Sequence, residues 1–499
     1  MENLTLGTVV RVTGGRILRG HRTLQLTGIS TNTHTLRNGE LFFALHGRTH
    51  DAHRFLPQAA AAGAGAAVVH RDDLIALAPH LPVVRVPDTT RALGDLAHWH
   101  RSQCEGTTVI AVTGSNGKTT AKDMLYHILS GVVRSIRSHK SFNNHVGVPL
   151  TLFQMRPDDV YAVVELGTNS PGEIARLCEI ADPEIGLLTN VSATHIEGLG
   201  SVRGVAREKA ALVRHTCRRA GAFYNADDFW SREIAKATNG SLYSFGLDNQ
   251  ADVRAGLPVW DDQSISFKMM GDGPRLTLPI PGRHNMLNAL GAIAVARKLG
   301  IDWGTIAERL ASFKLPDMRM QRIELGEILL INDAYNACPA SMEAAIDTLQ
   351  RVRRPGRKIL VLADMLELGG QAIDCHRKLG QLIANFDIDY LLGVGEHTAE
   401  VLDSAGRHGM SPHDLSLAQS KDQLAGTLLD LIGPGDTVLF KGSRSNKLEE
   451  VVDQVQNGLA RPGLHGQPAD HVYAQQNTGD TDANADGGPA NTPVARQVG

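Results

Sequence analysis

The sequence lacks any long run of basic residues, and its 50 lysines and arginines nearly balance 53 aspartates and glutamates, for a formal net charge of -3. A nucleic-acid groove or a surface for anionic membranes needs clustered positive charge, so we expect neither. No apolar run approaches the length of a membrane-spanning helix. The first residues, MENLTLGTVV, carry no basic segment followed by an apolar stretch. These absences predict a cytoplasmic protein without a membrane span.

Cysteine is also scarce. The chain has five cysteines, which are scattered and form no CxxC pair. Such spacing is typical of reduced thiols in a cytoplasmic protein.

The 499 residues, 42% of them hydrophobic, are enough for several cores, and at about 100–200 residues per domain they predict roughly three domains. Residues 1–100 mix short strands with the Ala/Gly-rich segment AAAAGAGAAVV, for which we predict a helix within a small N-terminal α/β domain. Residues 105–315 hold short continuous apolar runs, each followed by polar residues and a helical pattern. Parallel strands buried on both faces have this pattern, and here they read TTVIAV, YAVVELG, IGLLTNV and AGAFYNADD.

Alternating segments such as SISFKM and RLTLPI predict an antiparallel insertion over residues 241–281. After a predicted hinge at 313–316, four apolar runs predict the strands of a doubly wound, Rossmann-like domain over 316–459: EILLIND, RKILVLAD, DYLLGVG and DTVLFKGS. Residues 460–499 have one aromatic residue and are rich in Gly, Pro, Asn, Asp and Gln, so we predict a disordered tail. The predicted fold class is α/β with three domains.

The strongest local signal is a glycine turn between a predicted strand and a predicted helix. It reads Gly114, Ser115, Asn116, Gly117, Lys118, Thr119 and Thr120. Glycines let backbone N–H groups close around phosphates, and the helix N-terminus adds partial positive charge. Lys118 supplies a cation for the β- and γ-phosphates, and the Thr119 hydroxyl can ligate Mg²⁺. Val112 stands where the longer phosphate-loop pattern has its first glycine, so the shorter GxxGKTT form is present; the alternative is a plain glycine turn.

Two further side chains follow predicted strands of the same sheet. Glu165, within YAVVELG, lies at the C-terminal end of a predicted buried strand, and His195 comes just after the strand predicted in IGLLTNV. The carboxyl ends of parallel strands form the ligand edge of a doubly wound sheet, so both residues can converge with Thr119 on nucleotide-bound metal. An imidazole is an unusual ligand for Mg²⁺ and hints at a second ion. A structural role for each residue, and a solvated helix position for Lys209, remain the alternatives.

Together these motifs resemble those of the Mur ligases. The matching stretches occur in family order from about residue 105 to 455, and they are TGSNGKTTAKDML, KSFNNHVGVPLTL, ELGTNSPGEI, LTNVSATHIEGLGS, PGRHNMLNALGA, MRMQRI, INDAYNACPASM, LADMLELG and KGSRSNKLEEV. The resemblance implies an N-terminal UDP-sugar-binding domain, a central phosphate-loop ATPase domain and a C-terminal Rossmann-like ligase domain that closes over both. It implies ATP-dependent joining of D-alanyl-D-alanine to UDP-N-acetylmuramoyl-tripeptide through an acyl phosphate, in peptidoglycan synthesis. We expect the protein to be a monomer.

The resemblance also implies roles for single residues. Glu165 and His195 match magnesium ligands, two ions being expected, and Lys209 matches a lysine that the family carbamylates. With Lys118 and Arg319, which reaches the γ-phosphate, His195 and Lys209 form the implied catalytic set. The remaining implied contacts are Asn285 and Asn288 to adenine, Asp333 to ribose, and Ser30, Thr31, Asn143, Asn144, Tyr335 and Asn336 to substrates.

Some positions depart from the family pattern. In the predicted UDP-sugar domain these are Asn32, His34 and Ala52, and elsewhere Ser170, Ala211 and Cys338. Three other functions compete: another amide ligase of the same superfamily, a phosphate-loop switch or motor ATPase, and a non-catalytic nucleotide-sugar binding module. VVELG offers a single Glu where a switch ATPase has Asp or Asp-Glu, and NKLE lacks the Asp of a guanine motif.

Overall fold

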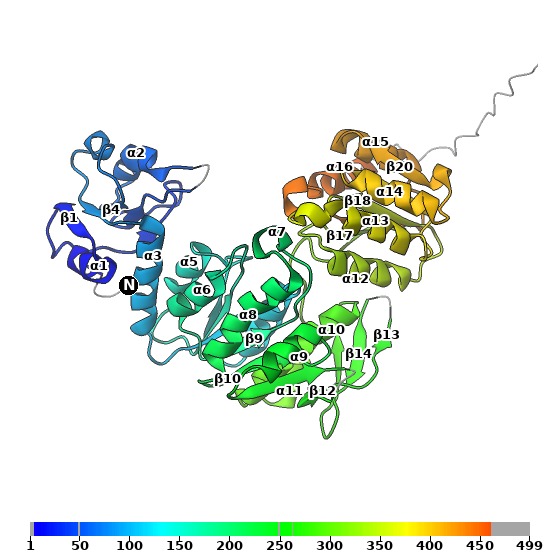
Figure 1. The fold of residues 1–499 in the computed structure, drawn as a ribbon, viewed down its shortest axis with the longest axis horizontal. Coiled ribbons are helices and arrows are strands. Elements are labelled where there is room, and N and C mark those ends of the chain that lie inside the picture. The colour runs from blue at the N-terminus through cyan, green and yellow to red at the C-terminus, as the bar shows by residue number, and fades with distance from the viewer. Residues whose placement is uncertain (1–3, 48–49, 248–249, 262, 461–499) are drawn as a thin grey trace, which may run out of the picture.

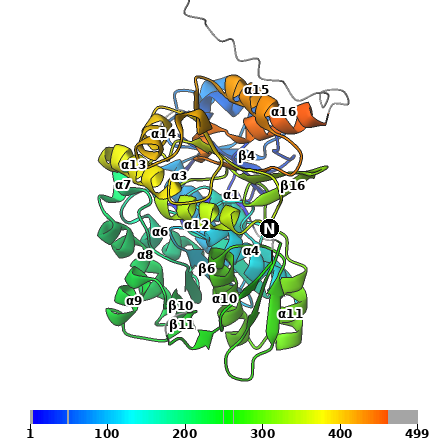
Figure 2. The ribbon, with the colours of Figure 1, turned by 90° about the vertical axis from the view of Figure 1, so that its right-hand side faces the viewer.

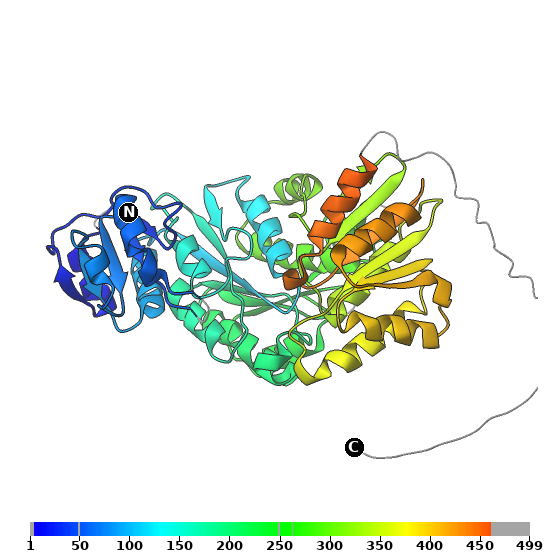
Figure 3. The same ribbon diagram turned by 90° about the horizontal axis from the view of Figure 1, so that it is seen from above.

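The computed structural model describes residues 4–47, 50–247, 250–261 and 263–460. This part of the chain forms three bodies in a row, each built on its own main sheet, with the central body in the middle (Figures 1 and 3). None of the helices in these ranges is long and apolar enough to cross a membrane. The tail predicted for 460–499 lies, apart from Ala460, outside the described residues.

The N-terminal body is built on a five-stranded sheet of order β1-β5-β4-β3-β2, in which only the β1–β5 pairing is antiparallel. Its elements are α1 (Leu6–Thr13), β1 (Arg16–Arg19), β2 (Ile29–Ser30), β3 (Leu41–Phe43), η1 (Ala52–Phe55), α2 (Leu56–Ala61), β4 (Ala66–Val69), η2 (Ile75–Leu77), β5 (Val83–Arg85) and α3 (Thr89–Ser102).

The helix predicted for AAAAGAGAAVV is wrong over its second half. Helix α2 ends at Ala61, and β4 (Ala66–Val69) is a fully buried parallel strand. Gly63, at φ +85°, turns the chain between them. Alanine content alone favoured a helix, whereas burial on both faces of the sheet selects the extended conformation for this short apolar run.

Helix α3 fastens the N-terminal body to the central one. It packs against α5 (Gly147–Leu152) and α6 (Glu173–Ala181). Gly94 of α3 permits the close approach, because a Cβ there would lie 2.7 Å from Cδ1 of Ile180.

The central body is a seven-stranded parallel sheet of order β12-β11-β10-β9-β6-β8-β7 with helices on both faces (Figure 1). Its further elements are β6 (Thr108–Thr113), α4 (Lys118–Leu129), β7 (Ser135–Arg137), β8 (Tyr161–Glu165), β9 (Ile185–Leu188), α7 (Ile196–Leu199), α8 (Val202–Thr216), β10 (Gly221–Asn225), α9 (Phe229–Lys236), β11 (Leu242–Gly246), β12 (Val253–Arg254), α10 (Arg283–Lys298) and α11 (Trp303–Ala311). The four apolar runs predicted as strands are β6, β8, β9 and β10.

The predicted antiparallel insertion is confirmed only in part. A three-stranded antiparallel sheet contains β13 (Val259–Trp260), β14 (Ile265–Lys268) and β15 (Arg275–Leu278). The preceding strands β11 and β12 instead extend the parallel sheet. Phe245 of β11 is buried in the central core, which explains why this segment joins the main sheet.

The C-terminal body is a six-stranded sheet of order β16-β17-β21-β18-β19-β20, parallel except at β16. Its elements are β16 (Gln321–Leu325), β17 (Ile328–Asp333), α12 (Pro339–Gln350), β18 (Lys358–Ala363), η3 (Gly369–Gln371), α13 (Ala372–Ile383), β19 (Tyr390–Val394), α14 (Thr398–Arg407), η4 (Pro412–Asp414), β20 (Leu415–Ala418), α15 (Lys421–Leu431), β21 (Thr437–Lys441), η5 (Arg444–Asn446) and α16 (Glu449–Leu459). The four predicted strands are present. The edge strands β16 and β20 were not predicted, because they are only partly buried and so carry no continuous apolar run.

Helix α12 of the C-terminal body faces α10 of the central body in two perpendicular views (Figures 1 and 2). The space between these two bodies holds the candidate site.

Candidate active site

The glycine turn lies at the carboxyl end of β6, and α4 begins at Lys118. Gly117 has φ +79°, and a Cβ there would lie 2.1 Å from Oδ1 of Asn288 on α10. A Cβ at Gly114 would lie 1.8 Å from Oγ1 of Thr189. Both glycines therefore allow the loop backbone to pack directly against neighbouring polar side chains.

We expect Gly117→Ala to raise the KM for ATP about tenfold, since a left-handed non-glycine residue costs about 1–2 kcal/mol and the new Cβ must displace Asn288. Steady-state kinetics with varied ATP measures the effect. Gly106→Ala is the matched control, because it lies just before β6 and a Cβ there meets no atom within 4 Å. Equal KM values for the two variants would contradict the prediction.

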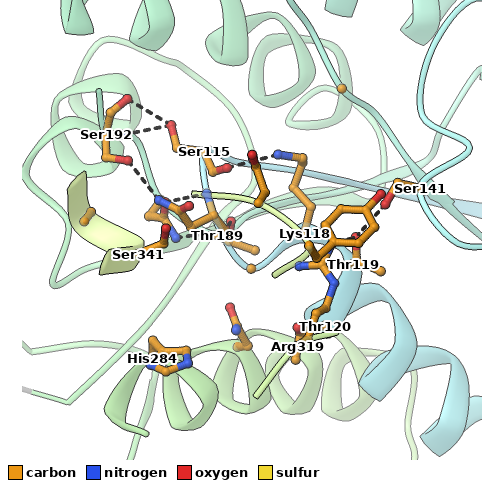
Figure 4. A pocket seen from close by; sticks show the side chains of 18 of the residues that line it. Ser115, Lys118, Thr119, Thr120, Ser141, Thr189, Ser192, His284, Arg319 and Ser341 are labelled. Carbon is orange, nitrogen blue, oxygen red and sulfur yellow. Dashed lines mark hydrogen bonds between the residues drawn. The ribbon is translucent and has the colours of Figure 1, made fainter. Parts of the chain in front are cut away.

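The segment after β9 holds the loop in shape. Backbone N–H of Ser192 donates to Oγ of Ser115 at 2.8 Å, and N–H of Asn116 donates to Oδ1 of Asn190 at 3.0 Å. Lys118 Nζ folds back to donate to the carbonyls of Gly114 and Ser115, at 2.7 and 3.1 Å. Figure 4 shows Ser115, Lys118 and Ser192 on one side of the pocket and His284, on α10, on the other.

The carboxylate of Glu165 lies next to the first turn of α4. The Thr119 hydroxyl donates to Oε2 of Glu165 at 2.8 Å, and Nδ2 of Asn143 donates to Oε1 at 2.8 Å. Glu165 is buried, with 1% of its surface exposed. The structure thus brings together Thr119 and Glu165, as their positions at strand and helix ends predicted.

His195 lies at the start of α7 with a left-handed φ of 53°. Its Nδ1 atom is 2.6 Å from Oε2 of Glu367 in the C-terminal body. This contact lowers the pKa of the Glu367 carboxyl, while burial opposes the shift. His195 lines the same pocket as Glu165, and its closest carboxylate belongs to the other body.

Lys209 lies on α8 and is 1% exposed, so the alternative of a solvated helix lysine is wrong. Burial lowers the pKa of this amine well below its usual range, and the nearby charge of Lys118 lowers it further, while Glu208 opposes the shift. A neutral amine is thereby favoured.

Arg319 reaches the loop from the far side of the predicted hinge. Its Nη2 donates to the Thr119 hydroxyl at 3.0 Å, and its guanidinium lies 4.2 Å from the centre of the Tyr335 ring. Met318 and Met320, on either side, both have left-handed φ values, of 61° and 50°. Asp333 accepts from N–H of Met320 at 3.1 Å, which holds this strained turn in place.

A cavity of about 800 Å³ lies between the central and C-terminal bodies. Most of the predicted site residues lie in it: Ser115, Asn116, Gly117, Lys118, Thr119, Thr120, Asn143, Asn144, Glu165, His195, Asn285, Asn288, Arg319, Asp333, Tyr335 and Asn336. Gly114 and Lys209 are not among the residues that line this cavity. Ser30 and Thr31 belong to the N-terminal body and do not line this cavity.

Three family models match successive parts of the chain. They are described as Mur ligase family, catalytic domain (residues 25–101), Mur ligase middle domain (112–296) and Mur ligase, glutamate ligase domain (318–444). The chain belongs to the Mur ligase family.

Relatives match over nearly their whole length. The UDP-N-acetylmuramoyl-tripeptide--D-alanyl-D-alanine ligase of Escherichia coli (strain K12) is 35% identical over 91% of this chain and 99% of its own. The protein of that name from Bacillus subtilis (strain 168) is 34% identical over 87% and 94%. A crystal structure of MurF from Acinetobacter baumannii superposes with a TM-score of 0.83 at 30% identity, covering 91% of this chain and 98% of that one. MurF ligase from Thermotoga maritima in complex with ADP gives 0.75 at 25% identity, over 88% and 99%.

Sequence reasoning missed several residues of this Mur ligase pocket. Lys441 Nζ donates to Oδ2 of Asp333 at 2.6 Å, and His284 has its pKa lowered chiefly by burial. Ser141 and Asn190 also line the cavity. All four lie inside stretches that carried the family resemblance, so the motifs contained the signal, but no spacing rule singled these residues out.

Proposed function

We propose that this Mur ligase joins D-alanyl-D-alanine to UDP-N-acetylmuramoyl-tripeptide, using ATP to activate the tripeptide carboxylate. The Escherichia coli and Bacillus subtilis relatives bear the name of that reaction, and the Thermotoga maritima homologue binds ADP. One observation on this chain carries the proposal: Arg319 of the C-terminal body donates to Thr119 of the phosphate loop. If different bodies hold the phosphate donor and the acceptor, the reaction requires a contact between those bodies at the phosphate loop, such as this hydrogen bond.

The chemistry follows from the charges. A carboxylate resists attack by an amine because it is anionic and lacks a good leaving group. Phosphoryl transfer from ATP gives an acyl phosphate, and the amine of the dipeptide displaces phosphate to form the amide. The protein supplies positioning and charge neutralisation. Loop N–H groups and the start of α4 bind the phosphates, while Lys118 and Arg319 offset the charge of the transferring group.

Thr119 and Glu165 fit a magnesium site. Mg²⁺ prefers oxygen ligands and is usually bound by one or two protein groups together with substrate phosphates and water, and these two residues offer a hydroxyl and a buried carboxylate in contact. Within the described ranges, no group of three His, Cys, Asp or Glu side chains suits a metal ion. Bound Mg²⁺ would offset phosphate charge, and we propose that Glu165 and His195, together with a carbamylated Lys209, serve a second ion.

The remaining assignments are proposals of the same kind. Residues 1–100 would hold the UDP-sugar, with Ser30 and Thr31 among its contacts, 105–315 the ATP, and 316–459 would complete the site. Asn285 and Asn288 would contact adenine, and Asp333 the ribose. Asn143, Asn144, Tyr335 and Asn336 would contact the peptide substrates. We further propose that the enzyme acts in the cytoplasm as a monomer.

Release of ADP in the presence of UDP-N-acetylmuramoyl-tripeptide tests the reaction. We expect it to require D-alanyl-D-alanine and to yield a product heavier by the dipeptide residue, as measured by mass spectrometry. Parallel assays offer a diamino acid with the shorter UDP-dipeptide, and glutamate with a folate. Turnover with either of those pairs, and none with D-alanyl-D-alanine, would instead identify another ligase of the superfamily.

Arg319→Ala is expected to lower kcat about 10²-fold while leaving the affinity for the UDP-sugar unchanged, since Arg319 meets the phosphate loop and not the N-terminal body. Turnover kinetics and calorimetric titration of the UDP-tripeptide measure the two quantities. Arg322→Ala, on the adjoining strand β16, serves as control because that guanidinium pairs with Glu324. If Arg319→Ala had the same kcat as the control, Arg319 would have no role in the reaction.

A further inference from the structure

A second lysine lies beside the phosphate loop, fully buried. Lys122 is on α4, one turn beyond Lys118, and none of its surface is exposed. Its Nζ donates to the carbonyls of Ser138 and Lys140, at 2.9 and 2.6 Å. The same atom lies 3.7 Å from Oε2 of Glu165. The reaction as derived above assigns this ammonium no role.

The loop that Lys122 holds also contacts Glu165. Residues 138–144 follow the edge strand β7, and Lys140 turns the backbone with a left-handed φ of 48°. The Ser138 hydroxyl accepts from N–H of Glu165 at 3.0 Å, and Nδ2 of Asn143 donates to the Glu165 carboxylate at 2.8 Å. The buried ammonium of Lys122 therefore connects α4 with this loop, and both lie next to the Glu165 carboxylate at the end of β8.

Two carboxylates, those of Glu165 and Asp123, lie near the ammonium of Lys122. A buried ammonium is costly unless carboxylates lie close to it, and the second carboxylate here is Asp123, 3.4 Å away. Asp123 is shared with Arg137, which lies 2.8 Å from the same oxygen. Burial lowers the pKa of Lys122, and the nearby charge of Glu165 is the first to oppose that shift, followed by that of Asp123.

We infer that Lys122 is a positioning residue that serves as the fixed counter-cation of Glu165. It holds the carboxylate in place before a divalent cation arrives, and its charge opposes that cation, so that it sets how tightly the site binds metal. The inference rests on the proposed role of Glu165 as a magnesium ligand. If Lys122 only supported the fold, replacing it would have the opposite effect on metal affinity, because a disturbed loop would bind the metal more weakly.

Binding of Mn²⁺ to the full-length enzyme with ADP, followed by electron paramagnetic resonance without turnover, separates the two roles. Lys122→Met keeps an unbranched side chain, one heavy atom shorter than that of lysine, and removes the charge, and we expect the Kd for Mn²⁺ to fall about 3- to 10-fold. Asp123→Asn leaves the charge of Lys122 less balanced, and we expect the Kd to rise about 2- to 5-fold. Lys140→Gln removes an exposed charge from the same loop and should change the Kd less than about twofold, because solvent screens it.

Unchanged or weaker Mn²⁺ binding by a folded Lys122→Met enzyme would overturn the inference. If that variant does not fold, an Asp123→Asn enzyme with the wild-type Kd overturns it instead. Glu165→Gln separates this failure from failure of the proposed function. If Glu165→Gln binds Mn²⁺ as tightly as the wild type, Glu165 is not a metal ligand and the proposed function fails at this point. If Glu165→Gln binds Mn²⁺ weakly but Lys122→Met does not bind it more tightly, only the role of Lys122 is rejected.

Discussion

Lys118→Ala should lower kcat by about 10²–10³ with the fold intact. Lys118 folds over the loop and donates to the carbonyls of Gly114 and Ser115, so its ammonium lies where phosphate oxygens would replace those two partners. Burial lowers the pKa of Lys118, while the nearby charge of Glu165 opposes that shift. Removing the cation deprives the transferring phosphate of its nearest fixed positive charge.

Initial rates of ADP release at saturating substrates measure the loss, and the melting temperature shows whether the variant is folded. Lys236→Ala is a suitable control, since this lysine on α9 is exposed and pairs with Glu233 on its own helix. A folded Lys118→Ala enzyme that turns over at the control rate would show that the loop is not the ATP site.

Lys209→Ala should be nearly inactive, and short carboxylates such as acetate should partly restore turnover. Carbamylation joins the neutral amine nitrogen to the carbon of CO₂ and releases one proton, leaving an anionic oxygen ligand where an ammonium would repel metal. Burial and the charge of Lys118 lower the pKa of Lys209, which supplies the neutral amine that this step needs. Glu165 and His195 alone are a sparse ligand set for a second hard ion.

Two measurements check this prediction. Rates of the Lys209→Ala enzyme with increasing acetate should rise to a plateau, and the Lys118→Ala enzyme should show no rescue. Wild-type enzyme equilibrated with ¹³C-labelled bicarbonate should give a carbamate signal by NMR that is absent from the Lys209→Ala enzyme. Full activity of Lys209→Ala without added carboxylate would show that Lys209 contributes only to packing and not to the reaction.

Local patterns sufficed for the elements that carry the chemistry. The order of strand, glycine turn and helix placed Lys118 and Thr119, because phosphate binding needs a backbone that only such a turn allows. Glu165 could be placed at the ligand edge because parallel strands end on the same side of a sheet. The helix misassigned at Ala66–Val69 shows the limit, since a short apolar run fits either conformation until its neighbours bury it on both faces.

By itself, the sequence determined the three-body α/β class, the phosphate loop and the resemblance to Mur ligases, since these depend on residues close together along the chain. Only the tertiary structure decided which distant groups meet. Arg319 and Thr119 are 200 residues apart, yet they share a hydrogen bond because the C-terminal body docks on the central one. The burial of Lys209 and Lys122 could not be predicted from the sequence either, because a helical lysine has the same local sequence pattern whether it is exposed or buried. Burial changes the pKa of each amine, and that environment is built by side chains from other strands and helices.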